Sequence, residues 1–276
     1  MRPAAIALTL LVAGAGSASA QSVAYEGSAG LSTGNYIFTT RTTTWSLTNG
    51  LALTSGPVTI RAAIPVWMQN STVVSGTGMG GVPSGGSSSD SVGMHRGGAG
   101  GMGGAGGPVA VARGSFTSYR VAVGDPVVGV TAALRSGDGV RLAAGAVVKA
   151  PLADTASFGT GQWDFGATGS LSVPAGSTAR VNLDLAWWRL GGISGLDFQD
   201  PVTATLSVMH ASFTGHGMSA WVRAGSSPLS GYDPPVMVGI DLLRLSEAGG
   251  VGVELSAGLT ETVPDIAVSA FWRRHL

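Results

Sequence analysis

The fold of this 276-residue chain is decided by a tight turn that leads into an alternating strand, PAGSTARVNLDLAW (residues 174–187). Pro and Gly in the first four residues are typical of a reverse turn. Apolar and polar side chains then alternate: Val181, Leu183 and Leu185 share one face, whereas Arg180, Asn182 and Asp184 share the other. A period of two residues predicts a β-strand with one apolar and one polar face.

This combination of turn and strand recurs along the chain. Short turns occur at 54–57, 136–139, 174–177 and 247–250, and the connections between them are longer and rich in Gly and Ser. Alternating segments predict strands at 22–33, 41–54, 57–68, 121–135, 139–150, 162–173, 177–189, 201–212, 216–226, 235–246, 250–260 and 264–274. Barrels that cross the bacterial outer membrane have short periplasmic turns and long extracellular loops. We therefore expect an all-β, transmembrane antiparallel β-barrel of about 12 strands (roughly 10–14), with both termini in the periplasm.

Composition agrees with a wall that faces lipid. Charged residues make up 11% of the chain, well below the ~25% of ordinary soluble domains. The formal net charge is +0 and Cys is absent from the sequence, so we expect no nucleic-acid partner and no disulfides. Residues 1–20 combine Arg2, an apolar run and the small residues Ala18-Ser19-Ala20, which predict a cleaved signal peptide. Residues 21–276 would then form the barrel, in the outer membrane of a Gram-negative bacterium.

The two faces of the predicted strands differ in size as well as polarity. One is bulky and apolar, and the other carries Gly, Ala, Ser and charged residues. A soluble barrel would pack the bulky face inside, whereas a membrane barrel turns it toward lipid. We expect the charged residues of the second face to line the lumen: Arg61, Asp184, Arg223, Asp241 and Glu254. They either line a polar pore or pair into a network that plugs it, and strand number does not decide between these alternatives.

Aromatic residues near strand ends predict two girdles at the membrane interfaces. Three of them fall at extracellular ends and two at periplasmic ends, all in the lipid-facing phase: Trp45, Trp163 and Trp187, then Tyr25 and Trp272. Trp67 differs, because the alternation predicts that its side chain points inward unless Pro65 shifts the register.

The segment 70–114 is rich in Gly, Ser and Met, and it has too little apolar surface to offset the entropy of an ordered chain. We expect a mobile extracellular loop of low complexity. A plug, a lid or a soft-metal site that includes Met94-His95 is the functional alternative. His residues with metal-ligand spacing are missing from this segment of the sequence, so we expect neither a metal nor a cofactor.

Three motifs follow one another in the middle of the chain: VGDPVVG (123–129), VKAPLAD (148–154) and FGTGQWD (158–164). Their order resembles that of a family of bacterial outer-membrane β-barrel transporters named for a pathway of phenol degradation. The resemblance implies a barrel, inserted by the barrel-assembly machinery, that transports small molecules. The chain departs from the family in ending with RRHL (273–276) rather than with an aromatic residue, and in its long 70–114 insert.

The same motifs place two carboxylates and the single Lys of the chain at one rim. By phase, Asp125, Lys149 and Asp164 face the lumen, and by topology they lie near the extracellular ends of three consecutive strands. They form either a charged constriction that contacts solutes or a structural ion pair that fixes the following loop.

Three functions compete at this point. The pattern favours a passive channel or transporter for small solutes, with outer-membrane lipid and an unknown solute as partners. A structural or adhesive surface barrel is the second hypothesis. The third is a lipid hydrolase, because His210-Ala211-Ser212 resembles the His-x-Ser arrangement of outer-membrane phospholipases. His210 falls at the periplasmic end of its strand, away from the outer leaflet where that chemistry is expected, so we predict no enzymatic activity.

Overall fold

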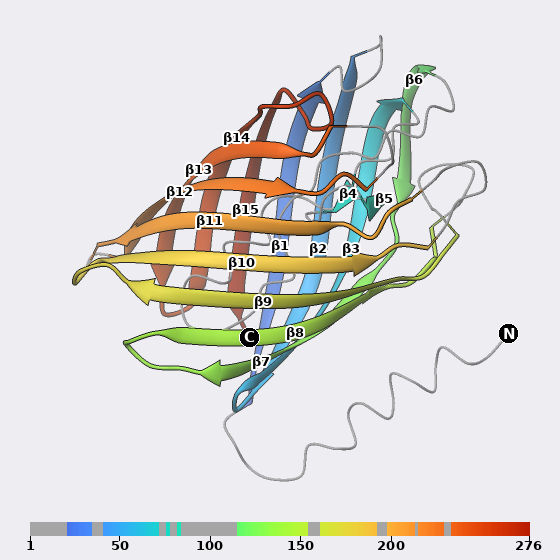
Figure 1. Cartoon of the computed structure of the whole chain (residues 1–276). Coiled ribbons are helices and arrows are strands. Elements are labelled where there is room, and N and C mark those ends of the chain that lie inside the picture. The colour runs from blue at the N-terminus through green and yellow to red at the C-terminus, as the bar shows by residue number, and fades with distance from the viewer. Residues whose placement is uncertain are drawn as a thin grey trace, which may run out of the picture.

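The alternating segments form one antiparallel sheet in the computed structural model of the chain (Figure 1). The structure describes residues 21–34, 41–71, 76–77, 82–83, 115–153, 161–191, 198–212, 215–228 and 233–276. The predicted signal peptide and nearly all of the predicted loop 70–114 lie outside these ranges. No helix within them is long and apolar enough to cross a bilayer.

Thirteen strands build the wall, and two more form a separate short pair. Their bounds are β1 (Gln21–Gly34), β2 (Thr42–Ser55), β3 (Val58–Ser71), β4 (Gly76–Thr77), β5 (Val82–Pro83), β6 (Ser115–Val123), β7 (Val127–Arg135), β8 (Arg141–Lys149), β9 (Asp164–Pro174), β10 (Ala179–Arg189), β11 (Val202–Ala211), β12 (His216–Gly225), β13 (Val236–Ser246), β14 (Gly249–Gly258) and β15 (Ile266–His275).

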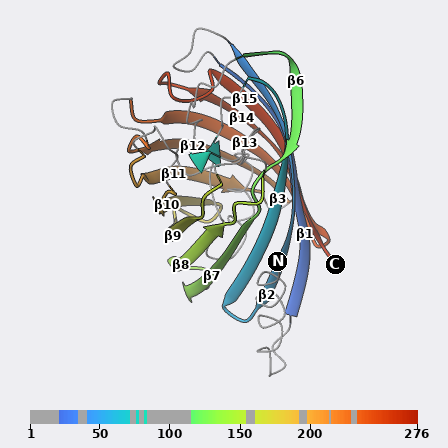
Figure 2. The same cartoon turned by 90° about the vertical axis from the view of Figure 1, so that its right-hand side faces the viewer.

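Pairing of the first and last strands closes the wall. Strands adjacent in the chain pair along the sheet, and β1 also pairs with β15 over ten residues, from Ala24↔His275 to Thr33↔Ile266. Because β6 and β7 are two parts of one interrupted strand, the wall has twelve strands, and the predicted antiparallel barrel is confirmed. The pair β4–β5 lies within the ring of wall strands in both views (Figures 1 and 2).

A β-bulge interrupts the strand opposite β3. The sheet pairs Val66 with Val123 on one side of the break and Ala63 with Val127 on the other. Three residues, 124–126, therefore lie opposite two residues of β3. One extra residue in one strand of a pair defines a β-bulge. The sequence led us to expect one uninterrupted strand over 121–135, which is wrong at this point.

Pro65 explains the position of the bulge. Its carbonyl accepts a hydrogen bond of 2.8 Å from the Gly124 N–H, but it has no N–H of its own to donate on that side. The extra residue in the opposite strand accommodates the missing donor and reverses the side-chain phase of β6, where Val121 and Val123 are exposed. Asp125 keeps the phase of β7 and is fully buried inside the barrel.

The barrel has a short-turn end and a long-loop end. Glycines with positive φ make the tight turns possible, for example Gly56 (φ 55°) and Gly176 (φ 94°). A fifth short connection, at 212–215, joins β11 to β12. Gln21 at the start of β1 pairs with Ser55, so the described chain begins at the short-turn end, and it also finishes there.

The two faces of the wall differ as predicted by the alternation. Along β14, Val253 and Leu255 are 48% and 45% exposed, whereas the intervening Glu254 is 1% exposed. The outward residues of the other strands are likewise mostly apolar and exposed. An exposed apolar surface of this extent is typical of contact with a membrane or a partner.

Inside the barrel, large aromatic rings lie against glycines of the neighbouring strand. Trp221 is paired with Gly239 and Phe271 with Gly252. An added Cβ on Gly239 would overlap the Trp221 ring, so the glycine provides the room in which the ring lies along the wall. Such aromatic–glycine pairs also fix the register of neighbouring strands.

We expect Gly239→Ala to lower the free energy of unfolding by about 1–3 kcal/mol, because the new methyl group displaces Trp221 from a packed position. Gly169→Ala in β9 is the matched control, since an added Cβ there meets nothing within 4 Å. The measurement is the temperature at which the folded band disappears on SDS gels. Equal transition temperatures for the two variants would contradict the proposed packing.

Candidate functional site: the charged lumen

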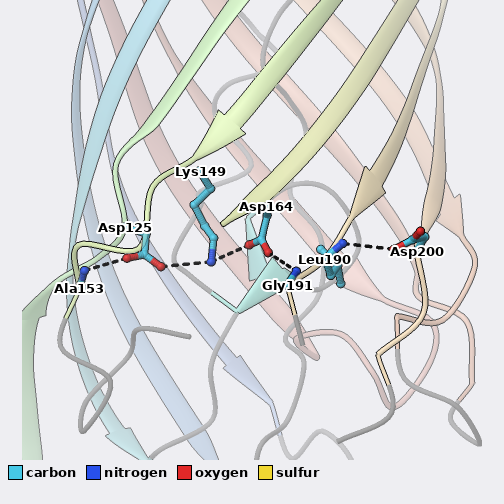
Figure 3. A network of polar contacts seen from close by, with 7 residues as sticks. All are labelled: Asp125, Lys149, Ala153, Asp164, Leu190, Gly191 and Asp200. Atoms are coloured by element: carbon cyan, nitrogen blue, oxygen red, sulfur yellow. Dashed lines mark hydrogen bonds and ion pairs between the residues drawn. The ribbon is translucent and has the colours of Figure 1, made fainter. Parts of the chain in front are cut away.

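The structure brings Asp125, Lys149 and Asp164 together at the long-loop end (Figure 3). Lys149 is the last residue of β8, Asp164 is the first residue of β9, and Asp125 lies in the bulge. Lys149 Nζ lies 3.1 Å from Asp125 Oδ2 and 2.6 Å from Asp164 Oδ2. We call these residues the rim triad. All three are at most 1% exposed, so a single ammonium compensates two buried carboxylates.

Backbone donors hold the outer oxygens of the rim triad. The N–H of Ala153 donates to Asp125 Oδ1 and the N–H of Gly191 donates to Asp164 Oδ1, both at 2.7 Å. These bonds tie the loops after β8 and β10 to the wall. The burial and the backbone bonds fit a structural ion-pair network, and a contact with passing solutes stays a prediction.

A second group lies deeper in the lumen. Asp184, Asp241 and Glu254 all interact electrostatically with Arg223; we call these four residues the lumen quartet. Arg223 Nε donates to Thr205 Oγ1 at 2.9 Å. The lumen quartet has three carboxyl groups and one guanidinium, so full ionisation would leave it with an excess of negative charge.

The wall holds the lumen quartet in a fixed geometry. The Arg223 guanidinium lies 4.6 Å from the centroid of the Trp221 ring, a cation–π contact. Asp241 accepts hydrogen bonds from Ser219 Oγ at 2.5 Å and from Trp221 Nε1 at 3.4 Å. Asp241 is also paired with Glu254 across β13 and β14. The charged side chains are therefore positioned by neighbours on the strands that carry them.

Arg61 belongs to a third group, nearer the short-turn end. Glu26 Oε2 lies 3.3 Å from Arg61 Nε, and Glu26 Oε1 lies 3.3 Å from Arg273 Nη1. Glu26 and Arg273 were not among the residues predicted to line the lumen. The alternation in the sequence indicates both residues. Each follows an outward-facing residue, Tyr25 or Trp272, and therefore faces the lumen.

The predicted girdle residues lie on the outward face. Trp45, Trp163 and Trp187 are 47%, 53% and 43% exposed, at the long-loop end. At the short-turn end, Tyr25 donates a 2.5 Å hydrogen bond to Asn49, and the Trp272 ring lies over Gly27. Their role at a membrane interface stays a prediction.

The residues considered for hydrolysis lie on the outside of the barrel near the short-turn end. His210 is exposed on β11, and Ser212, also exposed, follows that strand. The N–H of Ser212 donates to the His216 carbonyl at 2.7 Å, which places Ser212 in the turn. Among the described residues, no group of His, Cys, Asp or Glu is arranged to hold a metal ion. The absence of enzymatic activity stays a prediction.

Comparisons with family models and with curated proteins gave no match. Among solved structures, an outer-membrane channel from Pseudomonas putida F1 is similar with a TM-score of 0.66 and 11% identity, covering 94% of this chain and 97% of that chain. The transport unit of the autotransporter AIDA-I from Escherichia coli has a TM-score of 0.47 and 10% identity (98% and 97% covered). OpdQ from Pseudomonas aeruginosa has a TM-score of 0.38 and 8% identity (94% and 99% covered).

The likeness to the Pseudomonas putida channel shows that the chain has the fold of a bacterial outer-membrane barrel. The other two similarities are too weak to add to this. The resemblance to transporters of the phenol-degradation type stays a prediction.

Removal of the rim triad's cation should destabilise the barrel strongly. We expect Lys149→Met to cost about 3–5 kcal/mol, because it leaves two buried carboxylates without a counter-charge. Adding Asp125→Asn and Asp164→Asn to this variant should restore part of the loss, since the site is then uncharged. Urea unfolding of protein in liposomes gives the comparison.

Arg41→Met is the control, because the Arg41–Asp265 pair (3.1 Å) has side chains 56% and 51% exposed. Such exposed pairs contribute at most about 1 kcal/mol. A Lys149→Met variant no less stable than Arg41→Met would show that the rim triad does not hold the strand ends.

Proposed function

We propose that the protein resides in the outer membrane of a Gram-negative bacterium and allows passive passage of small solutes through its lumen. The separation of the two faces of the wall carries this proposal. Apolar residues such as Val253 are exposed outward, while the charged residues in the middle of their strands, such as Asp241 and Glu254, turn inward. Charges are costly on a lipid face and are tolerated inside a barrel. Inward charges are also the usual means by which pores select ions and solutes.

The similar barrel from Pseudomonas putida F1 is an outer-membrane channel, which supports a channel role for this chain. The specific solute is left open by this proposal. A barrel of twelve strands is intermediate between eight-stranded barrels filled by side chains and open sixteen-stranded porins. A narrow pathway for small solutes is the role that suits this size.

One observation favours a second candidate, a structural or adhesive barrel without a conducting pore. Asp241 and Glu254 face the lumen, yet both are at most 1% exposed. Side chains packed this closely across the whole lumen would plug it. The two candidates differ in whether ions cross the barrel.

Conductance in planar lipid bilayers separates the candidates. With KCl on both sides, we expect discrete current steps from the purified protein, and a larger step size when residues 72–114 are replaced by a two-residue Asn-Gly turn, if that segment restricts the entrance. A folded barrel that inserts and stays silent in both forms would favour the structural candidate.

The lumen quartet should influence which ion crosses. We expect Glu254→Gln to shift the reversal potential in a KCl gradient toward that of chloride, because it removes one carboxylate from the pathway. Glu247→Gln is the matched control, since Glu247 is exposed in the turn between β13 and β14. Identical reversal potentials for the two variants would exclude the lumen quartet from the ion pathway.

A further inference from the structure

The outward face of the wall carries basic side chains at one end of the barrel. The exposed residues at outward positions of the short-turn end include His210 on β11, His216 on β12, Arg244 on β13 and Arg274 on β15. We call these four residues the basic band. The acidic residues of the described strands are instead all in the lumen-facing phase: Glu26, Asp164, Asp184, Asp241 and Glu254. The outward charge of these strands is therefore of one sign.

The strand pairing brings the members of the basic band together. His216 lies directly opposite Arg244 on the neighbouring strand, and His210 lies opposite Met218, two residues along β12 from His216. Side chains directly opposite in an antiparallel pair have Cβ atoms about 4.5–5.5 Å apart, and diagonal neighbours are about 7–8 Å apart. Arg274 is separated from β13 by β14 alone. The first three members therefore form a continuous basic surface across three strands, with Arg274 beside it.

The arginines of the basic band have no acidic partner within the described part of the chain. The ion pairs there include neither Arg244 nor Arg274. Glu247, which is exposed in the adjacent turn, takes no part in them either. The exposed Arg41 at the long-loop end differs, because it pairs with Asp265 at 3.1 Å. The two arginines of the basic band are thus available to an anion from outside the chain.

The basic band continues into the apolar part of the outward face. Met218 and Leu242 are exposed on the same strands, each two residues farther from the short-turn end than His216 and Arg244. Charged residues on a lipid face are costly at the midplane of the bilayer and are tolerated near its interfaces. The order of the side chains, basic at the end and apolar beyond it, matches a molecule that has an anionic head group and acyl chains.

The sign of the outward charge selects among lipid head groups. An arginine guanidinium binds a phosphate through two parallel N–H···O bonds, and an imidazole N–H can donate a further bond. A zwitterionic lipid also carries an ammonium group, which needs an acidic partner, but the acidic residues of the described strands face the lumen. An anionic lipid needs only the basic side chains that the outward face presents.

We propose that the basic band binds an anionic glycerophospholipid, such as phosphatidylglycerol, in the membrane leaflet at the short-turn end. The phosphate lies between Arg244 and His216, Arg274 adds positive charge beside it, and the acyl chains extend along Met218 and Leu242. This inference rests on the membrane location in the proposed function and is independent of passage through the lumen.

Two lipids that differ only in head group test this class on the unaltered protein: dioctanoylphosphatidylglycerol and dioctanoylphosphatidylcholine. Native mass spectrometry of the full barrel, titrated in micelles of an uncharged detergent, counts the bound lipids and gives a dissociation constant for the first. We expect phosphatidylglycerol to bind at least about fivefold more tightly, because its head group is anionic. Equal affinity for the two lipids, or displacement of phosphatidylglycerol by an excess of glycerol 3-phosphate, would overturn the inference.

Two variants remove one outward charge at opposite ends of the barrel. We expect Arg244→Gln to weaken phosphatidylglycerol binding about 3- to 10-fold, the range for loss of one arginine near an anionic head group. Arg189→Gln is the matched control, because Arg189 is exposed at the outward phase of β10 at the long-loop end. Both side chains are exposed, so both variants should give a folded barrel on unheated SDS gels. Equal affinities of the two variants for phosphatidylglycerol would overturn the inference.

A second copy of the chain is the alternative occupant of the basic band, and the same spectra detect it. Dimers that persist when phosphatidylglycerol is added, and that dissociate in Arg244→Gln, would assign the basic band to a contact between copies and overturn the lipid site.

The bilayer recording keeps the lipid site and passage apart. A conducting barrel that binds the two lipids equally would overturn only the lipid site. A silent barrel that prefers phosphatidylglycerol, and loses this preference in Arg244→Gln, would confirm the lipid site and overturn passage.

Discussion

The closed ladder of backbone hydrogen bonds is the constraint on which the rest of this structure depends. In a hydrocarbon environment each unsatisfied N–H or C=O group costs several kcal/mol, so a sheet can cross a bilayer only when it has no free edge. The pairing of β1 with β15 removes that edge. Once the ladder is closed, a period of two residues sends each side chain either outward or inward, which separates the apolar and polar faces.

Closure also confines the charged residues to a small shared volume. The rim triad, the lumen quartet and the Glu26 group each combine both signs of charge. Pairing is expected because an isolated charge in such a setting is expensive. In the rim triad and the lumen quartet the carboxyl groups outnumber the cations, whereas Glu26 faces two arginines. The excess of acidic groups thus lies at the rim and in the middle of the barrel, and the excess of cations lies near the short-turn end.

Much of this arrangement could be predicted from the sequence. Period-two alternation and turn residues located the strands, because side-chain phase and turn chemistry are local properties. The same phase placed Asp125, Lys149 and Asp164 on one face near the same end. Alternation does not give the distances between these side chains. The 2.6 Å contact between Lys149 and Asp164 depends on the stagger of neighbouring strands, which is set by the whole barrel.

Other features depend on contacts between strands that are remote from any local pattern. The bulge at 124–126 arises because Pro65 lies opposite it in the neighbouring strand. The rings of Trp188 and Trp221 lie flat because glycines happen to be their cross-strand partners. Register is needed to see either effect.

Spin labels show which face of the wall contacts lipid. Because the chain lacks Cys, single cysteines can carry a nitroxide at Ser170 and Leu171, adjacent residues of β9 that point to opposite sides. Power-saturation spectra in liposomes compare collisions with oxygen, which concentrates in lipid, and with a water-soluble nickel chelate. We expect oxygen to relax the label at 171 more than the label at 170, because Leu171 points toward lipid. The reverse order, or equal oxygen accessibility at both positions, would contradict it.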